Sequence, residues 1–310
     1  MKFSVISPIY RGESMLHALV SRIEESVSSL TQDYEIILVN DCSPDHSWEG
    51  IKAICSQNNR VKGVNLSKNY GEQYALMAGL SVSQGDWVAI LDCDLQNRPE
   101  ELPRMYDLAI KEGYDTVFAS RQDRHDTPFR KLSSKVFNKI FSYFADYENE
   151  ERSAEFGVYS RKVVDAILSM GDSIKFFPAM AKWVGFNIGY LPVVHEERAD
   201  GSDSSYTLSK LVHLASDTMI GFSNRPLKLT LKVGFLIVLL CMAFVIWYLV
   251  DYMINGVVVS GFTTLVISLW LIAGILISIL GMLGIYIGKI FDQVKNRPVF
   301  IIKETINVDK

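Results

Sequence analysis

The sequence has few charged residues and no cysteine pattern that would support disulfides or a zinc site. Charged residues make up only 21% of its 310 residues, and hydrophobic residues make up 49%. The cysteines at 42, 55, 93 and 241 form no C-x-x-C pair, so we expect free thiols in a reducing compartment. The formal net charge of −4 provides no basic excess, and no nucleic-acid partner is expected.

Glycine-rich phosphate loops are also missing. No G-x-G-x-x-G follows the first apolar segment, and no Walker loop occurs anywhere in the chain. These loops are the signatures of dinucleotide-binding and P-loop proteins, so both classes lose their main support. Nothing at the N-terminus resembles a signal peptide, because Met1 and Lys2 lead straight into a short apolar strand.

Long uncharged runs are confined to the C-terminal third of the chain. Residues 233–250 and 252–288 contain no charged side chain. Since a bilayer core requires roughly 20 apolar helical residues, we predict two transmembrane helices at about 232–253 and 261–288. The alternative is a pair of buried helices in a soluble domain, but two adjacent runs of this length are difficult to bury in a domain of this size.

Basic residues flank the two predicted spans and are absent from the loop between them. They are Lys228 and Lys232 before the first span, and Lys289, Lys295 and Arg297 after the second. The positive-inside rule therefore places both termini in the cytoplasm. We expect a multi-pass protein of the inner (cytoplasmic) membrane, with a cytoplasmic domain at 1–225, a membrane domain at 226–288 and a cytoplasmic tail at 289–310.

The region before the spans alternates between apolar strands and amphipathic helices. Strands are predicted at 3–9, 34–39, 61–66 and 87–91, with helices at 13–30, 45–57 and 72–83. This rhythm is typical of an α/β fold with a mostly parallel sheet and helices on both faces. Residues 129–147 place basic and aromatic side chains on different arcs of a helix. That pattern suits an interfacial helix in the lipid headgroup layer, and equally an ordinary amphipathic core helix.

Two carboxylates, Asp92 and Asp94, follow the apolar run 87–91. Alternate side chains of an extended strand face the same way, so the two can converge on one hard cation such as Mg²⁺ or Mn²⁺. In open α/β sheets, ligands bind outside the carboxyl ends of the strands. The D-x-D tripeptide alone is common and also occurs in solvated turns, so its context decides its meaning.

Polar residues also follow the first two predicted strands. Tyr10 and Glu13 come after the first strand, and Asp41 comes after the second. A carboxylate such as Asp41 can accept hydrogen bonds from a ribose or a base N–H, although an aspartate after a strand is more often a turn residue. Together with a metal on Asp92 and Asp94, these groups predict a nucleotide-diphosphate site that has no glycine loop.

Four segments carry a resemblance to a known family. They are Ser7-Pro8-Ile9-Tyr10, residues 39–45 (VNDCSPD), residues 69–80 (NYGEQYALMAGL) and residues 91–96 (LDCDLQ). They resemble the glycosyltransferases of family 2, which have the GT-A fold, and most closely the polyprenyl-phosphate branch. The similarity continues through both predicted spans to residues 295–298, and implies a Rossmann-like GT-A catalytic domain followed by two transmembrane helices.

The resemblance implies an inverting, metal-dependent transfer of a sugar from a nucleotide-sugar to a polyprenyl phosphate at the cytoplasmic membrane face, for cell-surface glycan modification. The expected cofactor is Mg²⁺ or Mn²⁺. Transfer to a hydroxyl of a lipid-linked saccharide is an alternative. A second alternative is a non-catalytic membrane protein that binds nucleotide-sugar. The presence of Asp92, Asp94 and an acid at position 155 argues against it. Glycines at 274, 281 and 288, with Gly284, form a packing face for the partner span or for a second subunit, so a homo-oligomer is expected.

The same resemblance implies roles for individual residues. The nucleotide-sugar would bind Pro8, Tyr10, Glu13, Asp41, Asp92, Asp94 and Gln96. The metal would bind Asp92, Asp94 and Gln96, and the acceptor phosphate would bind Arg121, Arg124 and Arg198. Glu155 and Asp94 would be the catalytic residues.

Three positions depart from the family pattern. Arg11-Gly12-Glu13 stands where Asn-Glu is usual after the tyrosine, and Glu155 stands where Asp is common. Ser205 stands where the branch often has lysine. That last difference removes a cation from the expected phosphate site and favours the alternative in which the acceptor is not a simple lipid monophosphate.

Overall fold

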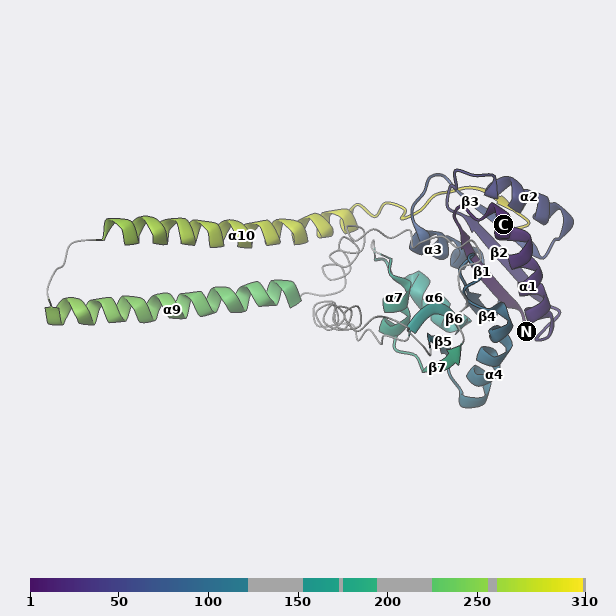
Figure 1. The fold of residues 1–310 in the computed structure, drawn as a ribbon, viewed down its shortest axis with the longest axis horizontal. Helices are drawn as coiled ribbons and strands as arrows, with labels where there is room; N and C mark the ends of the chain where they lie inside the picture. Colours follow the sequence, from purple (N-terminus) through teal and green to yellow (C-terminus); the bar gives the residue numbers. More distant parts are fainter. Residues whose placement is uncertain (122–152, 173–174, 194–224, 256–260, 309–310) are drawn as a thin grey trace. The chain divides into compact units, whose positions relative to one another are not determined.

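A computed structural model of the protein describes residues 1–121, 153–172, 175–193, 225–255 and 261–308 (Figure 1). The chain divides into two compact units. One unit contains a strand-and-helix domain together with Pro298–Lys310, from the far end of the chain. The other unit contains two long helices, α9 and α10.

The first unit is built on one eight-stranded sheet with the order β7-β5-β6-β4-β1-β2-β3-β8. Its strands are β1 (Phe3–Ile9), β2 (Tyr34–Asn40), β3 (Val61–Leu66), β4 (Trp87–Ile90), β5 (Thr116–Arg121), β6 (Ser153–Ser160), β7 (Ile188–Val193) and β8 (Ile302–Ile306). Strands β1 to β4 run parallel, as β7 does to β5, whereas β6 and β8 are antiparallel to their neighbours. The mostly parallel α/β sheet predicted from the sequence is confirmed.

Within the described residues, this unit has the helices η1 (Glu13–Met15), α1 (Leu16–Ser28), α2 (Ser47–Gln57), α3 (Glu72–Val82), η2 (Pro99–Glu101), α4 (Leu102–Glu112), α6 (Arg161–Ser169) and α7 (Phe177–Trp183). The helix predicted at 13–30 is therefore a 3₁₀ turn followed by α1. The helix predicted from 45 begins at Ser47, with His46 as its N-cap residue. The carboxylate of Asp45, one residue before the cap, accepts the Ser47 N–H.

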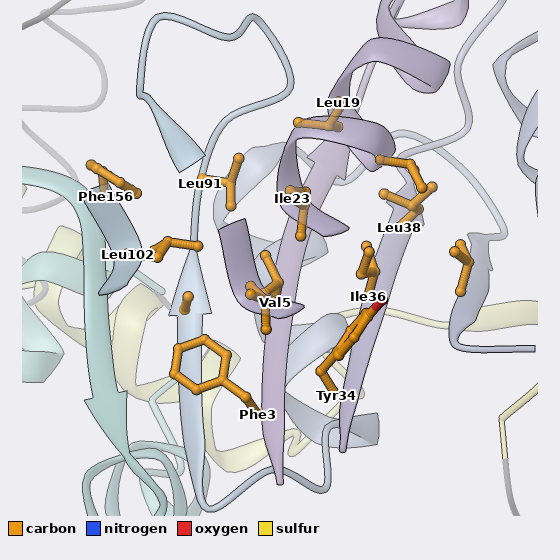
Figure 2. Packing of buried hydrophobic residues seen from close by; sticks show 14 of the residues in the cluster. Phe3, Val5, Leu19, Ile23, Tyr34, Ile36, Leu38, Leu91, Leu102 and Phe156 are labelled. Atoms are coloured by element: carbon orange, nitrogen blue, oxygen red, sulfur yellow. The ribbon is translucent and has the colours of Figure 1, made fainter. Parts of the chain in front are cut away.

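The core on one face of the sheet forms where alternate strand residues meet α1. Phe3 and Val5 of β1 lie beside Ile36 of β2, and all three are fully buried. Leu19 and Ile23 of α1 pack over them (Figure 2). Because these strands are covered on both faces, their apolar runs are nearly continuous rather than alternating.

The opposite face of the sheet is covered by α3, which approaches β1 and β2 very closely. A Cβ atom on Gly79 would lie 2.5 Å from Cγ2 of Ile6 and 3.0 Å from Cγ2 of Val39. No larger residue fits there unless the helix or the side chains of Ile6 and Val39 shift. The glycine thus fixes the distance of α3 from the sheet, and with it the position of the loop before α3.

The C-terminal segment returns to the sheet as an edge strand. Strand β8 pairs antiparallel with β3, and the indole Nε1 of Trp48 in α2 donates to Glu304 of β8 at 3.1 Å. The side-chain amide of Asn307 donates to the carbonyls of Cys55 and Val61, at 2.9 Å each. The segment predicted as a cytoplasmic tail at 289–310 therefore begins inside a long helix and ends as part of the sheet, where it covers the edge of β3.

The second unit contains α9 (Arg225–Asn255) and α10 (Phe262–Val294). Among the residues that the structure describes, one segment, Leu271–Val294, is long and apolar enough to cross a membrane, and none of it is buried. The span predicted at 232–253 is helical throughout, but two transmembrane helices are not confirmed. The predicted helix at 129–147 lies outside the described residues.

Candidate active site

The carboxyl ends of β2, β1 and β4 lie at one edge, because these strands are parallel neighbours in the sheet. Each is followed by a loop with one non-glycine residue in the left-handed region: Arg11 (φ 56°), Cys42 (φ 49°) and Leu95 (φ 59°). Such backbone is unfavourable for residues with a Cβ and persists where surrounding contacts hold it, often at functional sites. Three such loops at one edge mark this edge as the candidate active site.

The loop after β1 is fastened to the loop after β2. The backbone amide of Arg11 donates to Ser43 Oγ at 2.7 Å, and the carboxylate of Glu13 accepts the amide of His46 at 3.2 Å. Glu13 was predicted to contact the nucleotide-sugar. The structure places it at the predicted edge with its carboxylate bonded within the protein, so its contact with a donor stays a prediction.

Asp41 holds the loop between β3 and α3. It is 3% exposed, and its two carboxylate oxygens accept the amides of Tyr70 and Gly71 at 2.8 Å each. Burial raises the pKa of Asp41, and these two hydrogen bonds oppose the rise. Gly71 adopts φ 98°, a conformation that favours glycine. The predicted bond from Asp41 to a ribose or base is not tested by these contacts.

Asp92 and Asp94 follow β4 after one residue, Leu91, and are partly exposed at the same edge. The side-chain amide of Asn97 donates to Asp92 Oδ2 at 3.0 Å, and the backbone amide of Gln96 donates to Asp94 Oδ1 at 3.1 Å. Leu95, with its left-handed backbone, makes the turn that brings Asn97 back to Asp92. Both carboxylates are thus oriented by the loop that follows them.

The charge around Asp92 and Asp94 fits a cation. Burial, reinforced by the negative charges of Asp92, Asp94 and Glu72, raises the pKa of the Cys93 thiol to about 12 against an opposing hydrogen bond with the Tyr10 backbone. In the described ranges, no three His, Cys, Asp or Glu side chains gather closely enough to enclose a metal. Two carboxylates fit an ion such as Mg²⁺, which takes its other ligands from water and substrate phosphates.

The backbones of Glu155 and Arg121 lie at the same edge, on the strands beyond β4. Strand β6 is antiparallel to β4, with Gly157 opposite Ile90, so the backbone of Glu155, two residues earlier, lies near the point where the chain leaves β4. Arg121 is the last residue of β5, which runs in the direction of β4. The predicted phosphate ligands Arg124 and Arg198, and also Ser205, lie outside the described residues.

The remaining predicted donor residues follow the same pattern. Pro8 lies near the end of β1, and Tyr10 directly after it is 46% exposed at the edge. Gln96 contributes its backbone amide to Asp94, and its predicted role as a metal ligand stays a prediction. The structure therefore brings Pro8, Tyr10, Glu13, Asp41, Asp92, Asp94 and Gln96 to one edge of the sheet.

Sequence reasoning missed two supports of this site. Asn97, which is 3% exposed, was not singled out, although an amide shortly after a D-x-D is a possible partner for its carboxylates. Asp45 appeared in the sequence only as the start of a predicted helix and as the last residue of the family-like segment 39–45, yet it accepts the Glu13 amide at 3.3 Å. The S-P-D-x-S pattern at 43–47 signals local capping, but it contains no information about the neighbouring loop.

Comparison with known proteins identifies the family. Residues 4–168 match the family model described as glycosyl transferase family 2. The chain belongs to glycosyl transferase family 2. The resemblance inferred from the sequence is confirmed, and the protein is a glycosyltransferase.

Among the similar family 2 proteins is the undecaprenyl-phosphate 4-deoxy-4-formamido-L-arabinose transferase of Aeromonas hydrophila subsp. hydrophila. It is 35% identical over 98% of this chain and 93% of its own length. An uncharacterized glycosyltransferase of Bacillus subtilis, YkcC, is 31% identical over 100% of this chain and 95% of its own. Both therefore match this family 2 chain through its C-terminal third, well beyond residue 168.

Solved structures confirm the GT-A fold of the family 2 chain. Glucosyl-3-phosphoglycerate synthase from Mycobacterium tuberculosis, solved with Mn²⁺, uridine diphosphate and phosphoglyceric acid, matches with a TM-score of 0.53. The match covers 71% of this chain and 76% of that one, at 15% sequence identity. At this identity the likeness establishes the fold alone.

Proposed function

We propose that this transferase moves a sugar from a nucleotide-sugar to a polyprenyl phosphate at the cytoplasmic face of a membrane, with inversion at the sugar carbon. The observation that carries the proposal is the pair Asp92 and Asp94 at the carboxyl edge of the sheet, in a family 2 chain that continues into two long apolar helices. The name of the relative from Aeromonas supports an undecaprenyl-phosphate acceptor.

The donor half of the reaction would use Asp92 and Asp94 as ligands of Mg²⁺ or Mn²⁺. Bound there, the divalent ion acts as a Lewis acid that stabilises charge on a departing nucleoside diphosphate. Asn97 and the Gln96 amide keep the two carboxylates in place before the ion arrives. The Mn²⁺ and uridine diphosphate in the structure of the mycobacterial synthase support a divalent metal of this kind.

The acceptor half would require positive charge more than a base. The second pKa of a phosphate monoester is about 6, so the acceptor is largely dianionic near neutral pH. Arg121, Arg124 and Arg198 would offset the repulsion between the two anionic substrates through bidentate contacts. Glu155, on β6 beside the end of β4, would orient the phosphate or the sugar and stabilise developing positive charge.

The membrane half of the proposal places α9 and α10 across the inner membrane, with both termini in the cytoplasm. The apolar segment Leu271–Val294 and the exposed apolar side chains of α9 support this placement, among them Phe235 and Met253, which are 65% and 83% exposed. A Cβ on Gly274 or Gly281 of α10 would meet no atom within 4 Å. That open surface is compatible with a homo-oligomer formed by α10.

The proposal is tested by incubating membranes that contain the protein with a panel of labelled nucleotide-sugars. We expect one sugar to appear in extracted lipid, released by mild acid because a glycosyl phosphate is acid-labile. A product stable to mild acid would instead establish transfer to a hydroxyl of a lipid-linked saccharide. The carboxylate at 155 and Ser205 in place of a lysine favour that second candidate.

A further inference from the structure

Three successive backbone amides after β1 donate to side chains of the loop after β2 and of the first residue of α2. The amide of Arg11 donates to Ser43 Oγ at 2.7 Å, that of Gly12 to Ser47 Oγ at 3.1 Å, and that of Glu13 to Asp45 Oδ2 at 3.3 Å. One aspartate and two serines thus hold a whole segment of a neighbouring loop. We refer to Ser43, Asp45 and Ser47 as the clasp.

Asp45 organises the clasp. The hydroxyls of Ser43 and Ser47 both donate to Asp45 Oδ1, which leaves their lone pairs directed to the amides of Arg11 and Gly12. Burial alone raises the pKa of Asp45, but the hydrogen bonds from Ser43 and Ser47 outweigh it and lower the pKa overall. Asp45 is therefore an anion at neutral pH and accepts every hydrogen bond that it makes here.

The loop that the clasp holds lies against the metal-binding segment. A Cβ on Gly12 would lie 3.6 Å from Cys93 Sγ, and Cys93 stands between Asp92 and Asp94. Tyr10, at the start of the same loop, is exposed at the edge where the donor would bind. Because Arg11 and Cys42 have left-handed backbone, both loops depend on such contacts to keep their conformations.

We propose that Asp45 is a positioning residue for the donor site. Together with Ser43 and Ser47, it holds residues 10–13 against Asp92–Asp94. It thereby sets the distance between this loop, which would contact the nucleotide-sugar, and the metal ligands. Asp45 would contact neither substrate nor metal. The inference rests on the proposed function, because the donor is taken to be a nucleotide-sugar.

The substitution Asp45→Asn discriminates this role from helix capping. Asparagine has one carbonyl oxygen and one amide nitrogen, so it cannot accept from both serine hydroxyls and from the Glu13 amide. Since hydrogen bonds to charged groups are among the stronger ones, we expect KM for the nucleotide-sugar to rise about tenfold. KM for the lipid acceptor should stay within about twofold, since the acceptor is bound elsewhere on the edge.

Hydrogen–deuterium exchange of the full-length protein in detergent provides a readout that requires no knowledge of the donor. In Asp45→Asn, the amides of Arg11, Gly12 and Glu13 should exchange faster than in the wild type, while amides in β2 keep their protection. A purely local cap would instead accelerate exchange only in the first turn of α2. Unchanged exchange at 11–13 together with an unchanged donor KM would overturn the proposal.

Milder variants and a matched control complete the experiment. Ser43→Thr retains the hydroxyl and should keep the wild-type donor KM, whereas Ser43→Ala should raise it. If Asp45→Asn fails to fold, these two variants test the proposal in its place. Asp165→Asn, at an exposed ion pair with Arg161, removes the same charge away from the clasp and should leave both readouts unchanged. If the wild type transfers no sugar to lipid, the proposed function fails, and the exchange result still decides whether the clasp exists.

Discussion

Replacing Lys62 by methionine should destabilise the catalytic domain strongly at neutral pH. Lys62 of β3 lies 2.8 Å from Glu35 Oε2 of β2, and the two residues are 5% and 2% exposed. Breaking a buried ion pair costs about 3–5 kcal/mol, because the remaining charge is left in the interior. Glu35 keeps the bonds from Ser4 Oγ and the Gln84 amide, at 2.6 Å each, and Lys2 Nζ stays 3.3 Å from its Oε2, so we expect the lower end of that range.

The pH dependence has a definite sign. Burial raises the pKa of Glu35, but the hydrogen bond and charge of Lys62, with the bonds from Ser4 and Gln84, outweigh it and lower the pKa. In the wild type, this stability is present above the unfolded glutamate pKa and is lost as the pH falls through the folded value. In Lys62→Met, fewer interactions oppose the effect of burial, so the pKa of Glu35 rises. Lowering the pH then protonates Glu35 and removes the free-energy cost of its buried charge.

The two proteins should therefore converge in stability as the pH falls from 7 towards the ordinary glutamate pKa of about 4.3. Thermal unfolding in detergent at several pH values measures this. A loss of about 3 kcal/mol corresponds to roughly 6–12 °C in Tm for a domain of this size. Lys52→Met is the control, because Lys52 lies 3.7 Å from Glu304 in an exposed pair, which is expected to contribute at most about 1 kcal/mol. Equal Tm shifts for both variants at pH 7, or a Lys62→Met shift independent of pH, would refute the reasoning.

Three further predictions concern function. Asp94→Asn should abolish transfer and weaken donor binding in Mg²⁺ or Mn²⁺, measured by labelled-sugar transfer to lipid; full activity of this variant in EDTA contradicts the metal assignment. A reporter fused after Lys310 should be active in the cytoplasm, as the basic flanks of α9 and α10 require, and activity only on the other side of the membrane would exclude this topology. For a phosphate acceptor, the pH–rate profile of kcat should rise near pH 6 and keep its shape in Glu155→Gln, because no proton has to be removed. Loss of the acidic limb with a roughly 10²–10⁴-fold drop in rate would identify Glu155 as the base for a hydroxyl acceptor.

The order of elements was predictable because each depends on residues close together in the chain. The apolar runs at Phe3–Ile9 and Val61–Leu66 have the bounds that their composition predicts. The predicted grouping of Tyr10, Asp41, Asp92 and Asp94 also follows from the sequence, since the carboxyl ends of neighbouring parallel strands meet at one edge. The family motifs then predict the chemistry of this edge, which stays a proposal.

The details of the site depended on tertiary structure. Asp41 bonds amides at 70 and 71, and Asp45 reaches the Glu13 amide 32 residues away. A short polar motif shows that a side chain can accept hydrogen bonds, but it does not show which donor will be nearest. That choice is made by the packing of the strands that bring the two loops together.

The strand pairings also combine what the sequence predicts with what only the tertiary structure determines. The alternation of strands and helices predicted parallel strands in the N-terminal half, but β6 enters antiparallel between β4 and β5, and β8 joins β3 from the end of the chain. Trp48 and Glu304, which are 256 residues apart, form one of the bonds that hold β8 in place. The sequence of a segment determines that it forms a strand and which face of that strand is apolar. Its partner is determined by which unpaired backbone edge the folded domain leaves available.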